Sequence, residues 1–308
     1  MSRSSPQVAA RAPAKINLAL AVGAVRRDGY HDLATVFHAV SLYEDVLAEP
    51  GDGLEVVVRG EYADGVPTGP DNLALRAAAL LAERTGVDPA VRFTVTKTVP
   101  VAAGLAGGSA DAAATLVACD ALWQTGLSRD ALVELGGELG ADVPFCLVGG
   151  TALGTDRGDR LTPALARGEY HWVLALSSAR LSTAEVYAEC DRLRAGRALP
   201  EPRVPAGMMQ ALRSGDAQAL GAALSNDLQP AAVNLLPDLE RVLEVGSDYG
   251  ALGGVVSGSG PTVAFLVRDA EHALDLSVAL TASGVVRSVR RVRGPVPGAR
   301  VVEPVVLH

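Results

Sequence analysis

The stretch that most constrains this chain is a run of small residues, three of them glycines, at positions 100–110. Alternating apolar residues at 91–96 predict a strand before it, and Pro100 ends that strand. An alanine-rich segment to about Thr125 predicts a helix after it, with Ser109 as the N-cap. Such a junction lets backbone N–H groups approach an anion, and the helix start adds a partial positive charge. The segment therefore indicates a phosphate-binding loop, with a flexible turn before a helix as the alternative.

The loop matches neither of the two common nucleotide-binding patterns. No G-x-x-x-x-G-K-[ST] occurs in the chain, which excludes a P-loop protein, and no G-x-G-x-x-G follows a strand pattern. Lysine is rare, because of the 27 basic residues only Lys15 and Lys97 are lysines. The planar fork of arginine does not replace a compact ammonium beside a phosphate or a reacting oxygen. The two lysines therefore indicate functional positions, unless they are chance survivors in a composition that favours arginine.

Composition and charge narrow the class of protein. The 308 residues suffice for two domains, and 49% hydrophobic with 20% charged residues is typical of a globular chain. A net charge of −8 argues against a general nucleic-acid-binding protein. The three cysteines fit neither a disulfide framework nor a zinc site, and no stretch approaches the ~18 apolar residues of a membrane span. We expect a cytoplasmic protein that binds neither nucleic acid nor membranes, and the sequence predicts no oligomeric state.

A second functional surface is expected at residues 14–22, which alternate as a strand. The apolar side chains at even positions predict one buried face, and Lys15 and Asn17 share the other face. This pair favours the wall of a cleft, although a solvated edge strand would show the same pattern. Asp142 lies just ahead of Pro144 at a predicted helix start, where a carboxylate is either functional or only a cap.

The remaining pattern predicts strands and helices in two groups. Before residue 160 we expect strands at 35–42, 54–59 and 151–155, a helix at 72–85 capped by Asp71, and a helix at 128–139 begun by Ser128. After it we expect strands at 171–176, 253–256, 262–267 and 285–292, and helices at 182–194, 207–213, 217–224, 236–245 and 270–281. The fold class is α+β, with an N-terminal domain at 1–160 and a C-terminal domain at 161–308.

These features together suit phosphoryl transfer, which needs positioning and charge more than a covalent intermediate. An ammonium beside a carboxylate keeps the carboxylate ionised and stabilises an alkoxide as it forms, so Lys15 and Asp142 are the natural pair on the acceptor side. The loop and the lysine before it would hold a triphosphate. The predicted ATP-binding residues are Lys97, Pro100, Val101, Ala102, Ala103, Gly104, Leu105, Ala106, Gly107, Gly108, Ser109 and Ala110.

Five motifs follow one another along the chain. They are Pro-Ala-Lys-Ile-Asn-Leu at 13–18, Asp-Gly-Tyr-His at 28–31, the glycine-rich loop, Leu-Gly-Ala-Asp-Val-Pro at 139–144 and Ser-Gly-Ser-Gly-Pro-Thr at 257–262. This series, which covers nearly the whole chain, resembles the GHMP kinases (galacto-, homoserine, mevalonate and phosphomevalonate kinases). The resemblance implies an N-terminal ribosomal-protein-S5-domain-2-like domain, a ferredoxin-like C-terminal domain and an active site in the cleft between them. It also implies ATP with Mg²⁺ as the cofactor.

Within that family, the second and fourth motifs resemble the branch that phosphorylates the 2-hydroxyl of 4-diphosphocytidyl-2-C-methyl-D-erythritol, in the methylerythritol phosphate pathway of isoprenoid precursor biosynthesis. The implied catalytic pair is Lys15 and Asp142, with Asp142 as the base. His31 would hydrogen-bond the cytosine, and Tyr30 and Tyr187 would stack on its two faces. Taken alone, each tyrosine is equally consistent with a half-buried core residue. The implied substrate-binding residues are Asn17, Tyr30, His31, Phe37, Thr183, Tyr187, Gly258, Ser259 and Gly260.

Two positions depart from the family pattern. Asp111 stands where many relatives have asparagine or alanine, and no role is predicted for it; Tyr187 replaces a phenylalanine. No residue is predicted to bind the metal. The alternatives are another GHMP kinase of the mevalonate or homoserine type, or a non-catalytic nucleotide-binding module of the same fold. The Tyr30-His31 pair argues against the first, and the retention of both lysines with Asp142 argues against the second.

Overall fold

The computed structural model describes residues 6–303 of the chain. Its first half forms most of a mixed sheet and the helices that pack on it. The elements of this half are β1 (Val8–Val25), β2 (His31–Pro50), β3 (Leu54–Arg59), α1 (Leu73–Thr85), β4 (Val91–Thr96), α2 (Gly107–Trp123), α3 (Arg129–Leu139), α4 (Val143–Val148), β5 (Thr151–Asp156) and β6 (Arg160–Pro163).

The second half forms a smaller sheet with its own helices. Its elements are β7 (Tyr170–Leu176), α5 (Thr183–Arg194), α6 (Ala206–Ser214), α7 (Ala217–Ala223), β8 (Ser225–Asn226), α8 (Gln229–Leu235), α9 (Asp238–Asp248), β9 (Gly253–Val256), β10 (Val263–Val267), α10 (Ala270–Ser283), β11 (Ser288–Gly294) and β12 (Arg300–Val302).

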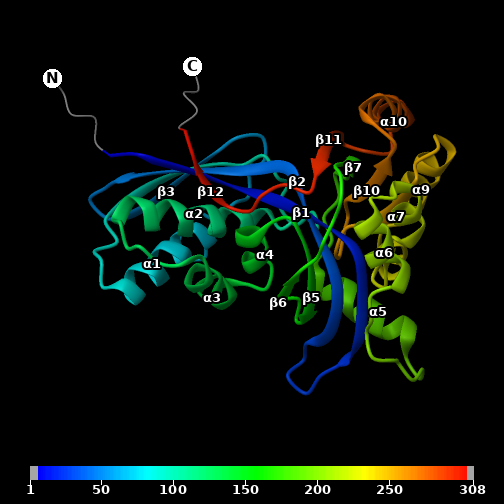
Figure 1. Ribbon diagram of the computed structural model, residues 1–308, viewed down its shortest axis with the longest axis horizontal. Helices are drawn as coiled ribbons and strands as arrows, with labels where there is room; N and C mark the ends of the chain where they lie inside the picture. Colours follow the sequence, from blue (N-terminus) through cyan, green and yellow to red (C-terminus); the bar gives the residue numbers. More distant parts are fainter. Residues whose placement is uncertain (1–5, 304–308) are drawn as a thin grey trace.

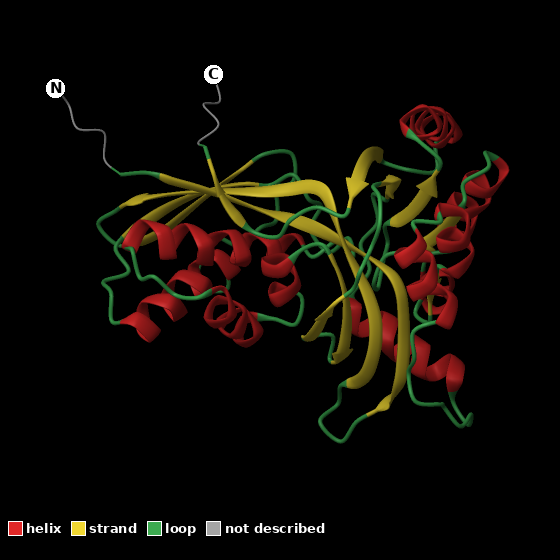
Figure 2. Ribbon diagram, viewed as in Figure 1, coloured by secondary structure: helices red, strands yellow, loops and turns green. Residues whose placement is uncertain are grey.

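The two sheets lie side by side in the molecule, each with helices against it (Figure 1). The larger sheet has the order β12-β1-β2-β4-β3, with β5 on β2, β6 on β5 and β8 on β1. Helices α1 to α4 gather below its flat part (Figure 2). The smaller sheet is antiparallel in the order β11-β7-β10-β9. This mixed architecture confirms the predicted α+β class.

The first two strands are much longer than predicted. The alternation at 14–22 and 35–42 belongs to strands of 18 and 20 residues. The pairing of β1 with β2 shifts register between Pro13 and Ala14, between Asn17 and Ala19, and between Val22 and Val25. Such irregularities bend a strand and increase its twist. The bent pair runs from the flat part of the large sheet past β5 towards α5 (Figure 1).

Two predicted helix caps are wrong. Asn72, not Asp71, caps α1, because its Oδ1 accepts hydrogen bonds from the amides of Ala74 at 2.8 Å and Leu75 at 3.4 Å. Helix α2 begins at Gly107, two residues before Ser109, and its N-cap Ala106 is left-handed and makes no side-chain bond. The glycines here continue the helix, so a glycine run is no certain end of helical structure. Ser128, in contrast, caps α3 as predicted, with its Oγ 3.2 Å from the amide of Ala131.

Some short elements were not predicted. They include β6, β8, α8 and β12, and the strand expected at 285–292 is observed as β11, Ser288–Gly294. The chain then returns to the first sheet, where Val302 pairs with Ala9 of β1.

Within residues 6–303, no helix is both long enough and apolar enough to cross a membrane.

Candidate active site

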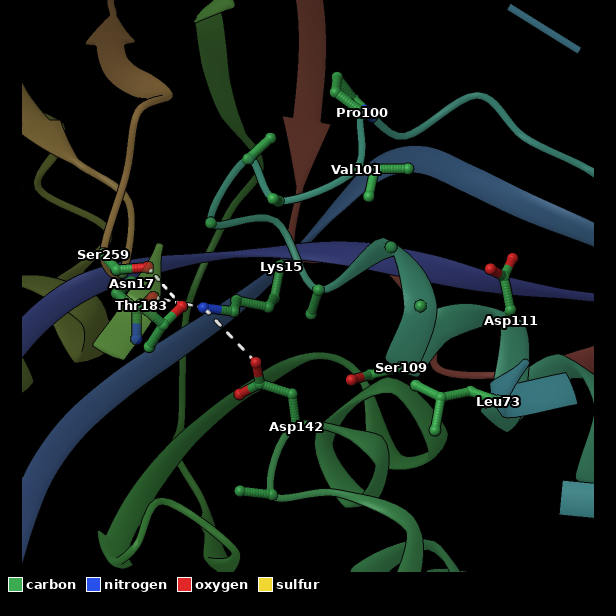
Figure 3. A pocket seen from close by; sticks show the side chains of 18 of the residues that line it. Lys15, Asn17, Leu73, Pro100, Val101, Ser109, Asp111, Asp142, Thr183 and Ser259 are labelled. Carbon is green, nitrogen blue, oxygen red and sulfur yellow. Dashed lines mark hydrogen bonds and ion pairs between the residues drawn. The ribbon is translucent and has the colours of Figure 1, made fainter. Parts of the chain in front are cut away.

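A cavity of about 550 Å³ opens between the large sheet and α5. Its walls come from β1, β2, the glycine loop, the first turn of α2, the residues before α4, helix α5 and the turn between β9 and β10. In Figure 3, Thr183 and Ser259 lie at one end, Leu73 and Asp111 at the other, and Lys15 faces Asp142 between them. Predicted site residues that line it are Lys15, Asn17, Phe37, Lys97, Pro100, Val101, Ala102, Ala103, Gly104, Ala106, Gly107, Gly108, Ser109, Asp142, Thr183, Tyr187, Gly258 and Ser259.

Lys15 and Asn17 sit on the cavity side of β1, where a chain of hydrogen bonds orients them. The ammonium of Lys15, 5% exposed, lies 2.7 Å from Asn17 Oδ1. Asn17 Nδ2 in turn donates to Thr35 Oγ1 at 2.8 Å, and Thr35 Oγ1 donates to a backbone carbonyl of β1. This chain turns the amide oxygen of Asn17 towards Lys15. The solvated edge strand is therefore not what the structure shows.

Asp142 faces Lys15 from the opposite wall. The distance between Lys15 Nζ and Asp142 Oδ2 is 3.9 Å, and the Asp142 side chain is 35% exposed (Figure 3). Asp142 occupies the N-cap position of α4, yet its side chain makes no capping hydrogen bond. Its carboxylate therefore remains available to accept a hydrogen bond from a hydroxyl in the cavity. A purely structural capping role does not account for this geometry.

The glycine loop is held in an unusual backbone conformation. Ala102, Gly104 and Ala106 have φ values of 53°, 74° and 59°. Left-handed alanines are uncommon, and each costs on the order of 1 kcal/mol. The turn after β9 supports the loop, because Ser257 Oγ donates to the carbonyl of Gly104 at 2.9 Å. A Cβ on Gly104 would lie only 2.0 Å from the carbonyl oxygen of Ser257, so the two segments approach as only glycine permits.

Lys97 does not present a free ammonium to the cavity. Its side chain is 1% exposed, and Nζ lies 2.6 Å from Glu44 Oε1 and 2.7 Å from Asp111 Oδ2. Lys97 lines the cavity, but its ammonium is paired with two buried acids, and its predicted role in binding ATP stays a prediction. Asp111, for which no role was predicted, is one of the two partners. Sequence reasoning missed Glu44, which lies 53 residues before Lys97 and in no motif.

Burial and mutual attraction shift the titration of these three groups. Burial alone would lower the pKa of Lys97, but Asp111 and Glu44 raise it, so the ammonium stays charged. Burial raises the pKa of both Glu44 and Asp111, because a carboxylate loses solvation there. Asp111 Oδ1 has no hydrogen-bond partner among the described residues.

Of the two tyrosines predicted to stack on a cytosine, Tyr187 lines the cavity and Tyr30 does not, and the sandwich stays a prediction. Tyr30 is 55% exposed and lies outside the cavity lining, with the Arg157 guanidinium 5.1 Å from its ring centre. Its neighbour His31 is 8% exposed, with Nε2 2.9 Å from Asp191 Oδ1 and its ring 5.0 Å from the ring of Tyr187. Burial raises the pKa of Tyr187, so its hydroxyl remains a hydrogen-bond donor.

The last predicted residues divide between the cavity and the protein interior. Thr183 Oγ1 lies 3.0 Å from Ser259 Oγ, which joins α5 to the turn after β9. Gly260 lies outside the lining, and a Cβ there would be 2.9 Å from a methyl of Val256. Leu105 and Ala110 are fully buried and also lie outside it.

Comparison with known proteins identifies the family. The family model described as "GHMP kinases N terminal domain" matches residues 72–150, and "GHMP kinases C terminal" matches residues 208–286. A relative from Leifsonia xyli subsp. xyli, named 4-diphosphocytidyl-2-C-methyl-D-erythritol kinase, is 56% identical over 94% of this chain and 97% of its own. The chain belongs to the GHMP kinase family, on the branch of the 4-diphosphocytidyl-2-C-methyl-D-erythritol kinases.

Solved GHMP kinase structures agree with the observed fold. A crystal structure named 4-(cytidine 5'-diphospho)-2C-methyl-D-erythritol kinase has a TM-score of 0.74 at 34% identity, covering 92% of this chain and 98% of that one. A mevalonate kinase from L. major has a TM-score of 0.76 at 17% identity, covering 95% and 98%, which shows the fold alone. The predicted two-domain GHMP kinase fold is confirmed. The boundary after residue 160 stays a prediction.

Other cavity residues of this GHMP kinase were missed by sequence reasoning. Near Leu73 the wall consists of apolar and polar side chains from the segment before α1 and from the first residue of that helix. Its members are Val66, Pro67, Asp71, Asn72 and Leu73. The sequence marked this segment only as the start of a helix. Nothing local indicated that the segment would reach the glycine loop, because that contact depends on how α1 packs beside α2.

Proposed function

We propose that this GHMP kinase transfers the γ-phosphoryl group of ATP to the 2-hydroxyl of 4-diphosphocytidyl-2-C-methyl-D-erythritol, in the methylerythritol phosphate pathway of isoprenoid precursor biosynthesis. The observation that carries the proposal is the Lys15–Asp142 pair, 3.9 Å apart, in the same cavity as the glycine loop. The names of full-length relatives at 53–56% identity support the choice of substrate. A cytoplasmic location belongs to the same proposal.

In this proposal, Asp142 accepts the proton of the substrate hydroxyl as that oxygen attacks the γ-phosphorus. Lys15 stabilises the negative charge that develops on the oxygen. The bond between the γ-phosphorus and the bridging oxygen breaks, and ADP leaves with that oxygen. The hydrogen bond to Asn17 holds the ammonium in place, so little reorganisation is needed during the reaction.

The glycine loop would hold the phosphates of ATP. Its backbone amides and the first turn of α2 supply donors without side chains that would keep an anion at a distance. The apolar wall at Val66, Pro67 and Leu73 offers a surface for the planar base of the nucleotide. The cytidyl group would lie at the opposite end, near Thr183 and Tyr187. The reacting groups then meet between the two ends, at Lys15 and Asp142.

Mg²⁺ would accompany ATP and neutralise charge on its phosphates. This ion binds proteins through one or two carboxylates and otherwise through water and phosphate oxygens. Residues 6–303 contain no group of three or more His, Cys, Asp or Glu side chains suited to a metal. Phosphate oxygens of ATP would therefore supply most of the ligands of the Mg²⁺ ion. This fits a cavity with few acidic side chains.

The test is ADP release from the purified protein with Mg-ATP. Separate reactions contain the cytidyl-methylerythritol substrate, mevalonate, homoserine or no acceptor. We expect ADP release with the cytidyl compound alone. ADP release with mevalonate or homoserine instead would show that the protein is a kinase but that the proposed acceptor is wrong. ATP binding without release in any reaction would support the non-catalytic nucleotide-binding module.

A further inference from the structure

Glu44 is a fully buried acid beneath the glycine loop. Its side chain, on β2, has 0% exposure. Its carboxylate accepts hydrogen bonds from two consecutive backbone amides, Thr98 N at 3.0 Å and Val99 N at 3.2 Å. The same Oε1 atom lies 2.6 Å from the ammonium of Lys97. One side chain therefore binds the segment by which the chain enters the loop.

The same carboxylate also lies against the end of the loop. A Cβ on Gly107, the first residue of α2, would be 3.2 Å from Glu44 Oε1. Lys97 continues the connection, because its Nζ donates to Asp111 Oδ2 at 2.7 Å on the second turn of that helix. Glu44, Lys97 and Asp111 form what we term the loop triad. It joins β2, the residue that follows β4 and the helix α2, which lie on either side of the loop.

Stability alone explains the loop triad poorly. Replacing a buried ion pair by apolar side chains is often neutral or stabilising, because removing charges from water costs several kcal/mol per ion. The triad has two acids for one base, and burial raises the pKa of both acids, so holding them charged costs free energy. Its geometric effect, in contrast, is specific: backbone amides at the start of a loop with left-handed alanines are fixed by a single group.

We propose that Glu44 is a positioning residue for phosphoryl transfer, acting through Thr98, Val99 and Lys97 to hold the glycine loop in the shape that receives the nucleotide phosphates. The inference rests on the proposed function. Glu44 does not touch the ligand, since it lies outside the cavity lining. Its loss therefore affects ATP binding through the loop and leaves the acceptor site unchanged.

The test is Glu44→Gln, compared with Glu49→Gln on the same strand but at a position outside the loop triad. The amide lacks the second acceptor oxygen and the charge that pairs with Lys97. We expect KM for ATP to rise about 10- to 100-fold, which corresponds to losing a charge-assisted hydrogen bond. We expect KM for the acceptor to stay within about twofold of wild type. For Glu49→Gln, we expect KM for ATP and KM for the acceptor both to stay within that range.

A second measurement needs no turnover. Amide hydrogen exchange at Thr98 and Val99 should be at least about tenfold faster in Glu44→Gln than in Glu49→Gln, because the carboxylate no longer protects these groups. A folded Glu44→Gln protein with unchanged KM for ATP would overturn the proposal. If wild type releases no ADP with any acceptor, the proposed function fails instead, and exchange still tests the contact with the loop.

Glu44→Asp keeps the proposal testable if Glu44→Gln does not fold. It preserves the buried charge that Lys97 requires but is shorter by one methylene group, so it cannot reach both amides and Lys97 together. We expect KM for ATP to rise at least about threefold, with KM for the acceptor unchanged. A folded Glu44→Asp protein with wild-type KM for ATP would reduce Glu44 to a structural partner of Lys97 and overturn the positioning role.

Discussion

At the scale of single residues, Asp142 combines exposure with a nearby cation. Replacing it by asparagine keeps the size of the side chain and removes the proposed base. We expect Asp142→Asn to lower kcat by about 10²–10⁴-fold, the contribution typical of general acid–base catalysis. ATP affinity should change little, because in the proposed binding mode the phosphates lie on the glycine loop and not at Asp142. The measurements are steady-state ADP release and ATP binding by calorimetry.

Asp130→Asn is the matched control for that prediction. Asp130 also lies at a helix start, in the first turn of α3, but it is exposed and outside the cavity. Its replacement should leave kcat within about twofold of wild type. An Asp142→Asn protein with wild-type turnover would remove Asp142 from the mechanism. A loss of ATP binding in that variant would assign Asp142 to the nucleotide instead.

The two lysines show what a sequence can and cannot predict about a residue. Lys15 was predicted from its place on a strand face shared with Asn17, and both line the cavity. Lys97 was predicted from its place before the loop, but its direction depends on Glu44, which pairs across the sheet from a distant segment. Local pattern gives the face of a strand. It does not give the partner that a buried charge will find.

At the scale of elements, the glycine loop and the turn after β9 depend on each other. Gly104→Ala would place a Cβ 2.0 Å from the Ser257 carbonyl oxygen, at a φ of 74°. We expect the loop to separate from the turn and KM for ATP to rise at least about tenfold, since strained backbone costs 1–3 kcal/mol. Steady-state kinetics with varied ATP measure this. Gly53→Ala, whose Cβ would meet nothing within 4 Å, is the control and should match wild type.

The failure of two cap predictions has the same origin at this scale. Asp71 and Asn72 are adjacent and both are good caps, so sequence alone does not decide between them. Asn72 is chosen because its Nδ2 also donates to the carbonyl of Pro67, at 2.6 Å. Ser109 was predicted because glycines usually interrupt helices, but Gly107 and Gly108 are the first two residues of α2. Neither boundary follows from the residue preference of a single position.

At the scale of the whole molecule, His38 joins the two sheets. Fully buried on β2, it packs 5.9 Å from the Tyr170 ring and 5.8 Å from the Trp172 ring of β7. Burial lowers its pKa to about 3 from 6.5. Between these values the unfolded chain binds a proton that the folded chain does not, so stability falls as pH drops below 6.5.

This linkage predicts that one residue, His38, sets part of the slope of the unfolding free energy against pH. Between pH 6 and pH 4, His38 should contribute a loss of up to about 1.4 kcal/mol of unfolding free energy per pH unit. His38→Gln removes the titrating group, so its stability should fall less steeply with acid than that of wild type. Urea unfolding of both proteins at several pH values measures the difference between the slopes. Parallel slopes would show that His38 is not held neutral by burial.

The division of the molecule into two domains was predicted because the expected strands and helices form two groups, one before and one after residue 160. The boundaries 1–160 and 161–308 stay a prediction, but the strand order shows why such a boundary is hard to read. Strand β6 begins at Arg160, and β12 returns to the first sheet beside β1. A three-residue strand has too few residues for alternation to be recognised. The pairing of β12 with β1 joins the two ends of the chain, so it depends on tertiary structure and not on local sequence.

The returning segment should therefore stabilise the N-terminal half. The amide of Val296 donates to the carbonyl of Ala39, and its carbonyl accepts from the amide of Gly150. The fully buried Ala299 donates to the carbonyl of Cys146 at 2.9 Å. A chain that ends at Pro295 loses these bonds and exposes the edge of β1, so we expect its unfolding free energy to fall by about 2–5 kcal/mol. A chain that ends at Glu303 keeps them and is the control. Equal urea midpoints for the two truncations would show that the N-terminal sheet is stable without the strand that the C-terminal half supplies.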